Sequence, residues 1–243
     1  MCKVIGIDVS KHQGTINWND VKKDKNEIDF VIMRAGYGKG NKDVCFENNY
    51  LGAKRVGLPV GVYWYCYAAN ANEALDEAKA CVEVLKGKQI DLPIFYDVEE
   101  AKSFRNSPEI IETFCSYLEN KGYFTGVYCS ESVVKSYCPG VTARYAGWIA
   151  NWTKKPANIP YKVWQYSSKG AVKGITSAVD MDNWISEDDF LYVQEYIYKN
   201  GLNGYTRPEP VAGDTPIPNA NANETVVYED ADIRIIKKFS KST

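Results

Sequence analysis

The stretch PIFYDVEEAK, residues 93–102, begins like a buried strand and ends in clustered negative charge. Its apolar and aromatic residues lead to Asp97, Glu99 and Glu100. Carboxylates this close raise one another's pKa and destabilise a fold unless the protein uses them. Asp97 and Glu99 are two residues apart, so in a strand they point to the same face, with Cα atoms roughly 6.6 Å apart. The stretch predicts a strand that ends in a functional pair of acids.

Seven further segments have the composition of short buried strands. The eight predicted strands are residues 3–10, 29–38, 59–68, 92–99, 124–130, 145–152, 161–168 and 177–184. Helical patterns fall at residues 18–27, 45–56, 71–87, 107–121, 130–137 and 186–200. Strands that alternate with helices predict a parallel sheet, and eight such strands can close into a (β/α)8 barrel.

Two connections in the second half of the chain are too short for full helices. They are TKKPANIP, residues 153–160, and KGAVKGIT, residues 169–176. We therefore expect an α/β fold, an irregular TIM-like (β/α)8 barrel that lacks some helices in its C-terminal half. The helix at 107–121 is the best marked, with Ser107 predicted as its N-cap, Pro108 as its first residue and Gly122 as its stop.

The composition changes after the predicted barrel. We expect residues 1–200 to form the barrel domain, 201–224 to be a Pro-rich linker and 225–243 to be a tail of unknown structure. Three roles stay open for the tail: docking on the barrel, pairing with another chain, or beginning a further module.

Bulk properties exclude several classes of function. The chain has 243 residues, 45% of them hydrophobic, and a net charge of −2 without a basic run, so nucleic acid is not an expected partner. The longest apolar run, residues 58–69, is too short to cross a membrane. Seven Cys without a C-x-x-C pair argue against a disulfide framework and against a zinc site, and we predict no metal or other cofactor. The cysteines favour synthesis in a reducing compartment.

Four acids are expected to meet at one rim of the barrel. Catalytic groups of parallel barrels lie at the C-terminal ends of strands. Asp8 ends the first predicted strand and Asp180 lies in the eighth, so both should join Asp97 and Glu99. Paired carboxyls suit glycoside hydrolysis, because one acid protonates the leaving oxygen while a second negative group stabilises charge on the sugar. We expect Asp97 and the other acids, in a partly dehydrated cleft, to raise the pKa of Glu99. The alternative is that Asp8 and Asp180 only cap turns or pair with Lys.

Aromatic residues on or after the predicted strands support a sugar ligand, because sugar C–H faces pack on rings and Tyr hydroxyls bond hydroxyl groups. The candidates are Tyr37, Tyr63, Tyr65, Tyr67, Tyr96, Trp148, Trp152, Trp164 and Tyr166. Each is also a candidate for the core. Other chemistries have weak support: His12 is the single His, and the Gly-rich segment 36–41 lacks a phosphate-binding pattern.

As a set, these segments resemble glycoside hydrolase family 25, the lysozymes of the Chalaropsis and phage-endolysin type. The resemblance covers residues 3–195. It rests on GIDVSKHQG (6–14), GVYWYCYA (61–68), IFYDVEE (94–100), WIANW (148–152), VWQYSS (163–168) and AVDMDNW (178–184). One departure is Trp64, which stands where many members carry His.

The resemblance implies cleavage, without a cofactor, of the β-1,4 bond between N-acetylmuramic acid and N-acetylglucosamine in bacterial peptidoglycan. Glu99 matches the general acid/base and Asp97 the acid beside it, and the remaining two active-site acids match Asp8 and Asp180. Tyr63 and Gln165 match positions that line the cleft. The predicted substrate-binding residues are Tyr37, Tyr63, Tyr65, Trp148, Gln165 and Tyr166. The resemblance leaves open whether the intermediate is covalent or formed by the substrate's own N-acetyl group.

Two other functions, a chitinase-type enzyme and a non-catalytic sugar-binding barrel, are also compatible with a barrel of this kind. A chitinase-type enzyme is disfavoured because Leu92 and Phe95 stand where its signature places further Asp residues. A non-catalytic sugar-binding barrel is disfavoured because all four acids are present. No signal peptide is visible, which suits an enzyme made in the cytoplasm and released to the wall like a phage endolysin; otherwise a leader was removed before this numbering. The oligomeric state is not predicted.

Overall fold

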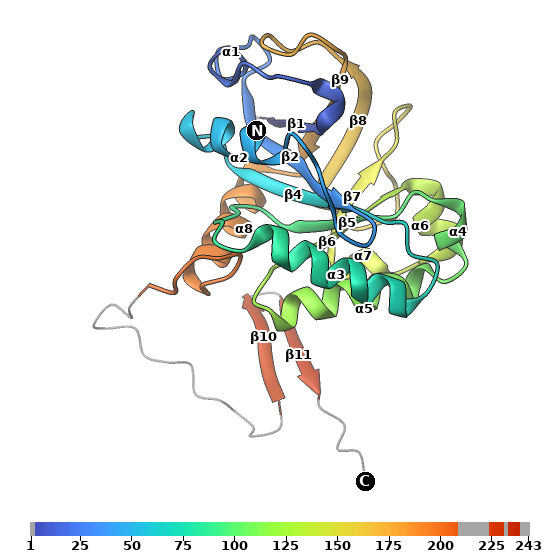
Figure 1. The fold of residues 1–243 in the computed structure, drawn as a ribbon. Coiled ribbons are helices and arrows are strands. Elements are labelled where there is room, and N and C mark those ends of the chain that lie inside the picture. The colour runs from blue at the N-terminus through green and yellow to red at the C-terminus, as the bar shows by residue number, and fades with distance from the viewer. Residues whose placement is uncertain (1–2, 209–223, 231–232, 239–243) are drawn as a thin grey trace. The chain divides into compact units, whose positions relative to one another are not determined.

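The computed structural model describes residues 3–208, 224–230 and 233–238, which fall into two units (Figure 1). The first unit runs to Pro208 and the second begins at Glu209. In the second unit, β10 (Glu224–Asp230) and β11 (Ile233–Lys238) form an antiparallel pair within the predicted tail. No helix in the described ranges is long and apolar enough to cross a membrane.

Eight strands of the first unit close into a barrel. They are β1 (Val4–Val9), β2 (Ile28–Tyr37), β4 (Val60–Tyr65), β5 (Ile94–Asp97), β6 (Thr125–Ser130), β7 (Ala146–Ala150), β8 (Val163–Gly170) and β9 (Val179–Trp184). Their order is β1-β9-β8-β7-β6-β5-β4-β2, and pairing of β1 with β2 closes the ring. All eight overlap the predicted strands. The two-residue β3 (Asn41–Lys42), which extends the edge of β2, was not predicted.

The direction of β9 corrects the prediction of a parallel barrel. Seven strands run parallel, but β9 is antiparallel to both of its neighbours, β1 and β8. The cause is the eight-residue connection 171–178 between β8 and β9, since a parallel crossover needs a dozen residues or more. The barrel is therefore mixed, and the first residues of β9, not its last, lie beside the C-terminal ends of the other strands.

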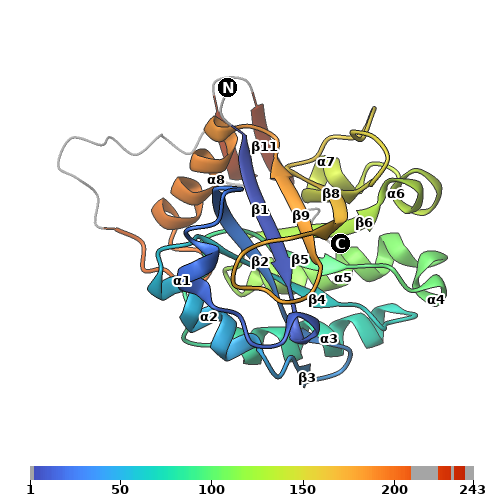
Figure 2. The same cartoon turned by 90° about the horizontal axis from the view of Figure 1, so that it is seen from above.

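Helices cover the outside of the barrel (Figures 1 and 2). They are α1 (Trp18–Val21), α2 (Phe46–Arg55), α3 (Ala71–Leu85), α4 (Ala101–Phe104), α5 (Ser107–Asn120), α6 (Glu131–Tyr137), α7 (Val141–Arg144) and α8 (Glu187–Lys199). No helix lies between β7 and β8 or between β8 and β9, as expected. The cap of α5 differs from the prediction: Asn106 is its N-cap, and Ser107 is already helical, its hydroxyl donating to the carbonyl of Phe104.

The apolar core has two layers because successive strand residues face opposite sides of the sheet. The inner layer fills the barrel and includes Phe30, Phe95 and Trp148. The outer layer packs the strands against the helices. Gly6 makes room inside the barrel, because a Cβ there would lie 2.3 Å from the ring of Phe30. The six described cysteines are free, and five of them are buried, as expected for small apolar residues.

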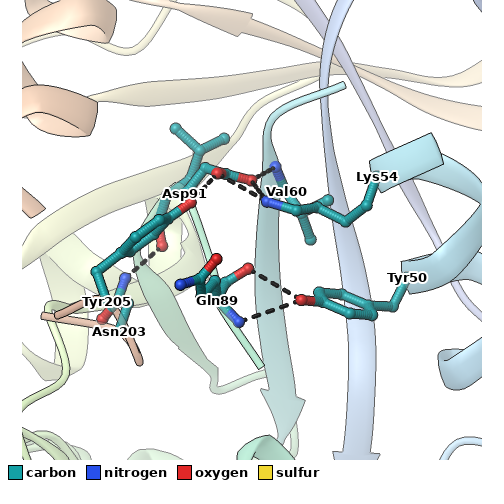
Figure 3. A network of polar contacts seen from close by, with 8 residues as sticks. Tyr50, Lys54, Val60, Gln89, Asp91, Asn203 and Tyr205 are labelled. Carbon is teal, nitrogen blue, oxygen red and sulfur yellow. Dashed lines mark hydrogen bonds and ion pairs between the residues drawn. The ribbon is translucent and has the colours of Figure 1, made fainter. Parts of the chain in front are cut away.

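The barrel unit extends further than predicted. Asn203 is fully buried, and its side chain accepts a hydrogen bond from the amide of Phe124 (2.7 Å) and donates one to the carbonyl of Leu92 (2.9 Å). The hydroxyl of Tyr205 donates to Asp91 (Figure 3). Residues 201–208 therefore belong to the barrel unit, and the predicted start of the linker was wrong. Residues 209–223 of that linker lie outside the described residues.

Candidate active site

The four predicted acids lie at the same rim. Asp8 is the fifth residue of β1, Asp97 is the last residue of β5, and Glu99 follows two residues later. Asp180 is the second residue of the antiparallel β9, opposite Asp8 in the register of the two strands. Electrostatic coupling joins Asp8 to Asp97 and Asp180 to Glu99. Burial and the nearby Glu99 raise the pKa of Asp180 to about 6.

Asp97 and Glu99 form a carboxyl pair with unequal access to solvent. Asp97 is 4% exposed, whereas Glu99 is exposed at the mouth of the barrel. Burial first, and then Glu99, raise the pKa of Asp97 well above its usual range, and Arg34 lowers it. The pKa of Glu99 is also raised, because the surrounding protein excludes water from part of the carboxyl. Two carboxyls coupled in this way titrate as a pair, so together they hold a proton above the usual carboxyl pKa.

The causes of the Glu99 shift agree with the prediction except for Asp97. The direction is as expected, but the hydrogen bond with Asp97 lowers the pKa of Glu99. Partial burial raises it, and the charge of Glu100 adds to that effect. Desolvation of the rim therefore matters more for Glu99 than crowding by Asp97 does.

Gln165 fixes the orientation of Asp8. The amide nitrogen of Gln165 donates to Oδ2 of Asp8 (2.8 Å). The amide oxygen accepts from the hydroxyl of Tyr128 (2.9 Å) and from the indole N–H of Trp152 (3.0 Å). An indole N–H can only donate, so the Gln165 oxygen must face Trp152 and its nitrogen must face Asp8. The predicted cleft residue Gln165 thus holds one acid in place.

Sequence reasoning missed Asp182, a fifth acid in the same layer of the barrel. Asp182 is fully buried on β9, and its Oδ1 accepts a hydrogen bond from the indole N–H of Trp148 (2.8 Å). Burial raises its pKa to about 8, and Asp180 adds to the increase. The signal was present, since Asp182 is two residues after Asp180 and so faces the same side of the strand.

Arg34 was also missed, although it carries a positive charge close to the acids. Its Nε donates to Oδ2 of Asp43 (2.7 Å), and both side chains are buried. The charge of Arg34 lowers the pKa of Asp97, which favours the ionised form of that carboxyl. Arg34 lies on β2, where an apolar run is interrupted by one charged residue, and this interruption was the available signal.

Three predicted tyrosines lie close to the acids or to their neighbours. Tyr63 is buried beside Asp8 and Asp97. The hydroxyl of Tyr65 donates to Glu100 (2.9 Å). The ring of Tyr37, at the end of β2, has the guanidinium of Arg34 5.4 Å from its centroid. These three side chains remain candidates for sugar contact.

Two predicted sugar contacts are placed differently. Trp148 is fully enclosed, with its ring centroid 4.5 Å from that of Tyr128, so it forms the floor beneath the acids and not a platform for a sugar. Tyr166 is half-buried, packs against the outer core layer and Trp164 (5.7 Å between centroids), and is close enough to Asp182 for that charge to raise its pKa. Trp152, by contrast, is 58% exposed and bonded to Gln165, which makes it the better candidate for stacking.

The described residues offer no group of three or more His, Cys, Asp or Glu side chains arranged to hold a metal ion. A surface hollow of about 500 Å³ is lined by residues 15–18, Arg55 and 174–176, and it contains none of the acids.

A closed eight-stranded barrel with paired carboxyls and aromatic side chains at one rim is the arrangement of a barrel-type glycoside hydrolase. Comparison with known families agrees. The chain belongs to glycosyl hydrolases family 25, whose family model matches residues 7–175.

Relatives and solved structures of this family resemble the chain over most of the barrel. The autolytic lysozyme of Clostridium acetobutylicum is 31% identical over 183 residues, 74% of this chain and 55% of that protein. The modular autolysin LytC of Streptococcus pneumoniae, solved with a synthetic peptidoglycan ligand, is 32% identical over 75% of this chain and 46% of that one, with a TM-score of 0.68. The catalytic domain of the endolysin ply40, from bacteriophage P40 of Listeria monocytogenes, is 28% identical over 79% of this chain and 98% of that one, with a TM-score of 0.69. The chain thus spans about half the length of the first two proteins.

Proposed function

We propose that the chain is a peptidoglycan hydrolase that cleaves the β-1,4 bond between N-acetylmuramic acid and N-acetylglucosamine in bacterial cell walls. The observation that carries the proposal is the Asp97–Glu99 pair, in which a buried carboxyl lies beneath an exposed one at the rim of a family 25 barrel. The lysozyme and endolysin names of the relatives support a cell-wall substrate. The proposed partner is peptidoglycan, and the proposed place of action is the bacterial wall.

Glu99 is the proposed general acid. It is the member of the pair that a polysaccharide can reach, and its raised pKa favours the protonated form that must donate to the glycosidic oxygen. After donation, the Glu99 carboxylate can accept a proton from the attacking water. A polysaccharide that covers the rim would exclude more water and raise the pKa of Glu99 further.

Asp97 is the proposed electrostatic partner of Glu99. At 4% exposure it lies too deep to touch the leaving group, but its charge can stabilise the positive charge that develops on the sugar. Burial and Glu99 raise the pKa of Asp97 and Arg34 opposes that rise, so the pair holds one proton, which must lie on Glu99 when it is donated. Asp8 and Asp180, which face each other across β1 and β9, complete the acidic rim. This placement suits an intermediate formed by the substrate's own N-acetyl group better than attack by a buried carboxylate.

The proposed sugar contacts lie on both sides of the acids. Tyr37 and Tyr65 come from β2 and β4, and Trp152 follows β7 on the other side of the barrel. Their rings can pack on sugar faces, and Tyr hydroxyls can bond sugar hydroxyls. The polysaccharide would then cross the rim between these two groups, above the carboxyl pair.

The test is Glu99→Gln, assayed for release of reducing sugar from purified peptidoglycan. The amide keeps the shape and can donate a hydrogen bond, but it cannot transfer a proton, so the rate should fall by about 10²–10⁴-fold. A wall pull-down should show binding that is unchanged. Glu109→Gln, the same substitution at an exposed position on α5, should retain normal activity.

Mass analysis of the digested wall identifies the bond that is cut. A new reducing end on N-acetylmuramic acid supports the proposal. Cleavage of chitin in preference to cell wall would point to a chitinase-type enzyme, and binding without any cleavage by the unmodified chain would point to a sugar-binding barrel. Near-normal lysis by Glu99→Gln would move the acid role to Asp8 or Asp180.

A further inference from the structure

Two buried carboxyl oxygens in the rim layer have no hydrogen-bond partner in the described part of the chain. They are Oδ1 of Asp97 and Oδ2 of Asp182. Each belongs to an acid that has another acid as a close neighbour. Asp97 has a role in the proposed mechanism, whereas Asp182 has none. A buried carboxyl with one unpaired oxygen is unfavourable as an anion, so its protonation state needs an explanation.

In the described part of the chain, the titratable groups coupled to Asp182 are acids and phenols. Oδ1 is engaged by the indole N–H of Trp148 at 2.8 Å. The titratable groups that face Asp182 from the strands around it are Asp8 on β1, Asp180 on β9, Tyr128 on β6 and Tyr166 on β8. An isolated buried carboxylate takes up a proton when no positive charge compensates it.

Asp8 is held by Gln165 and has Asp182 as a neighbour on the same face of the sheet. Its Oδ2 accepts from Gln165, whose orientation Tyr128 and Trp152 fix. In the strand register, Asp182 lies opposite Gln165 on β8 and opposite Gly6 on β1. Because β1 pairs Asp8 with Asp180 on β9, Asp182 is the diagonal neighbour of Asp8 on the same face of the sheet. The charge of Asp182 raises the pKa of Asp8, so the two carboxyls are close enough for a direct contact. Such a contact needs a proton, because two carboxylates offer only acceptors.

We propose that Asp8 and Asp182 share one proton, and that Asp182 acts as the positioning residue that holds Asp8 at the rim. The shared proton satisfies the second oxygen of Asp182 and removes one negative charge from the interior of the barrel. Asp182 touches no substrate in this arrangement. Its effect on catalysis, through Asp8, rests on the proposed function, whereas the shared proton does not.

Titration behaviour agrees with this arrangement. Burial raises the pKa of Asp182 to about 8, and burial together with Asp182 raises the pKa of Asp8 well above its usual range. Below about pH 8 the pair therefore keeps a proton. As the pH rises past that value Asp182 ionises, and the buried contact between the two carboxyls is weakened by the added negative charge.

The direct test follows the indole N–H resonance of Trp148 by NMR in the free protein, between pH 6 and 9. This N–H donates to Asp182, so its resonance should shift with a midpoint near pH 8 in the unmodified chain and stay constant in Asp182→Asn. Trp184 is an internal control, because its indole N–H donates to Oδ2 of Asp189 at 2.7 Å. Asp189 is paired with Lys162 and lies outside this cluster. Trp148→Phe and Trp184→Phe assign the two resonances. A Trp148 resonance that does not move in the unmodified chain would overturn the proposal, whether or not the protein cleaves cell walls.

The functional test compares Asp182→Asn with Asp182→Ala. The Asn amide imitates the protonated acid: its oxygen can accept from Trp148 and its nitrogen can donate to Asp8. Asp182→Asn should stay within about threefold of the unmodified rate at pH 6, and its rate should persist to higher pH. Asp182→Ala should lose at least tenfold. An Asp182→Asn variant as inactive as Asp182→Ala, yet folded, would show that the negative charge of Asp182 is needed and would overturn the shared proton.

Thermal unfolding supplies a measurement that does not depend on activity. The pKa of Asp182 is higher in the folded chain than in the unfolded one, where it has its usual value near 4. Its contribution to stability is therefore complete below about pH 4 and is lost as the pH rises through about 8. Asp182→Asn should raise Tm more at pH 9 than at pH 5. An equal effect at both values would contradict a proton held by the pair.

Discussion

Strand β5 runs between two acids whose surroundings are opposite. Three residues before the strand begins, the partly buried Asp91 is surrounded by donors: Nζ of Lys54 at 2.9 Å, the amide of Val60 at 2.8 Å and the hydroxyl of Tyr205 (Figure 3). At the end of the strand, Asp97 has a carboxyl neighbour, Glu99, and one oxygen without a partner. Six residues apart in sequence, one acid is satisfied and the other is not.

The difference separates stability from chemistry along the barrel. A carboxylate with a cation and several donors stabilises the fold in its ionised form. A carboxyl buried among other acids resists ionisation and destabilises the fold, but it gains a pKa that acid–base catalysis can use. Figure 3 shows that the stabilising end ties the start of β4 and the segment with Asn203 and Tyr205 to Asp91. One end of the barrel thus stabilises the fold and the other carries the catalytic residues, as in other closed α/β barrels.

The largest expected effect comes from replacing Asp by Asn at both ends of the barrel, at Asp97 and at Asp91. Asp97→Asn should lower the rate of wall hydrolysis by about 10²–10⁴-fold, because the charge is lost and an amide donor would favour ionised Glu99. Its Tm at pH 7 should stay equal or rise, since a buried acid becomes a neutral amide. Asp91→Asn should leave the rate per folded molecule unchanged and lower stability by about 1–2 kcal/mol, which is several degrees of Tm for a unit of this size.

Reducing-sugar release and calorimetry on both variants provide the comparison. If Asp91→Asn lost activity in proportion to Asp97→Asn, the two ends would be coupled and the separation would fail. If Asp97→Asn lost several degrees of Tm, the rim acid would be part of the stabilising framework.

Much of this contrast was predictable from local sequence. Strands rich in Val, Ile and Tyr are recognisable because each is a short apolar run, and Asp8, Asp97 and Asp180 stand out as charges inside such runs. Face alternation then places Asp97 and Glu99 together. The same alternation could have found Asp182, and the eight-residue link 171–178 could have revealed the antiparallel β9, because no parallel crossover is that short.

Other parts depend on contacts between distant segments. Asn203 lies in a stretch that reads as linker, and only its partners Leu92 and Phe124, 111 and 79 residues away, show that it is core. Trp148 and Tyr166 are aromatic residues on strands, like Tyr63 and Tyr65. The way the barrel closes decides whether a ring lines the cleft, lies beneath the acids or packs in the outer core layer. Amino-acid composition alone does not predict this.

Asn203→Ala tests the stabilising end. Removing the amide leaves the buried N–H of Phe124 and the carbonyl of Leu92 without partners, at about 1–3 kcal/mol each, and Asn also tolerates the positive φ of +54° better than Ala does. We expect a loss of about 3 kcal/mol in chemical denaturation and an unchanged rate for the folded fraction. Asn200→Ala, at the exposed end of α8, is the matched control and should change stability little. A small effect of Asn203→Ala would mean that residues 201–208 do not hold the barrel.

Trp152→Phe has the smallest expected effect and tests the hydrogen bonds that hold Asp8 through Gln165. The phenyl ring keeps an apolar face for stacking but removes the N–H that reaches Gln165 at 3.0 Å, so the Gln165 oxygen keeps only Tyr128 as a donor. One neutral hydrogen bond contributes about 0.5–1.5 kcal/mol, so kcat should fall by roughly 2–10-fold with KM for peptidoglycan nearly constant. Trp164→Phe loses an equivalent indole bond, to the carbonyl of Asn151 (2.8 Å), on the outer face of the next strand, and should leave kcat unchanged. Trp152→Ala should raise KM as well, because the ring itself is gone. Equal kcat for Trp152→Phe and the unmodified chain would show that Tyr128 alone orients Gln165, and that the exposed indole acts on the sugar only.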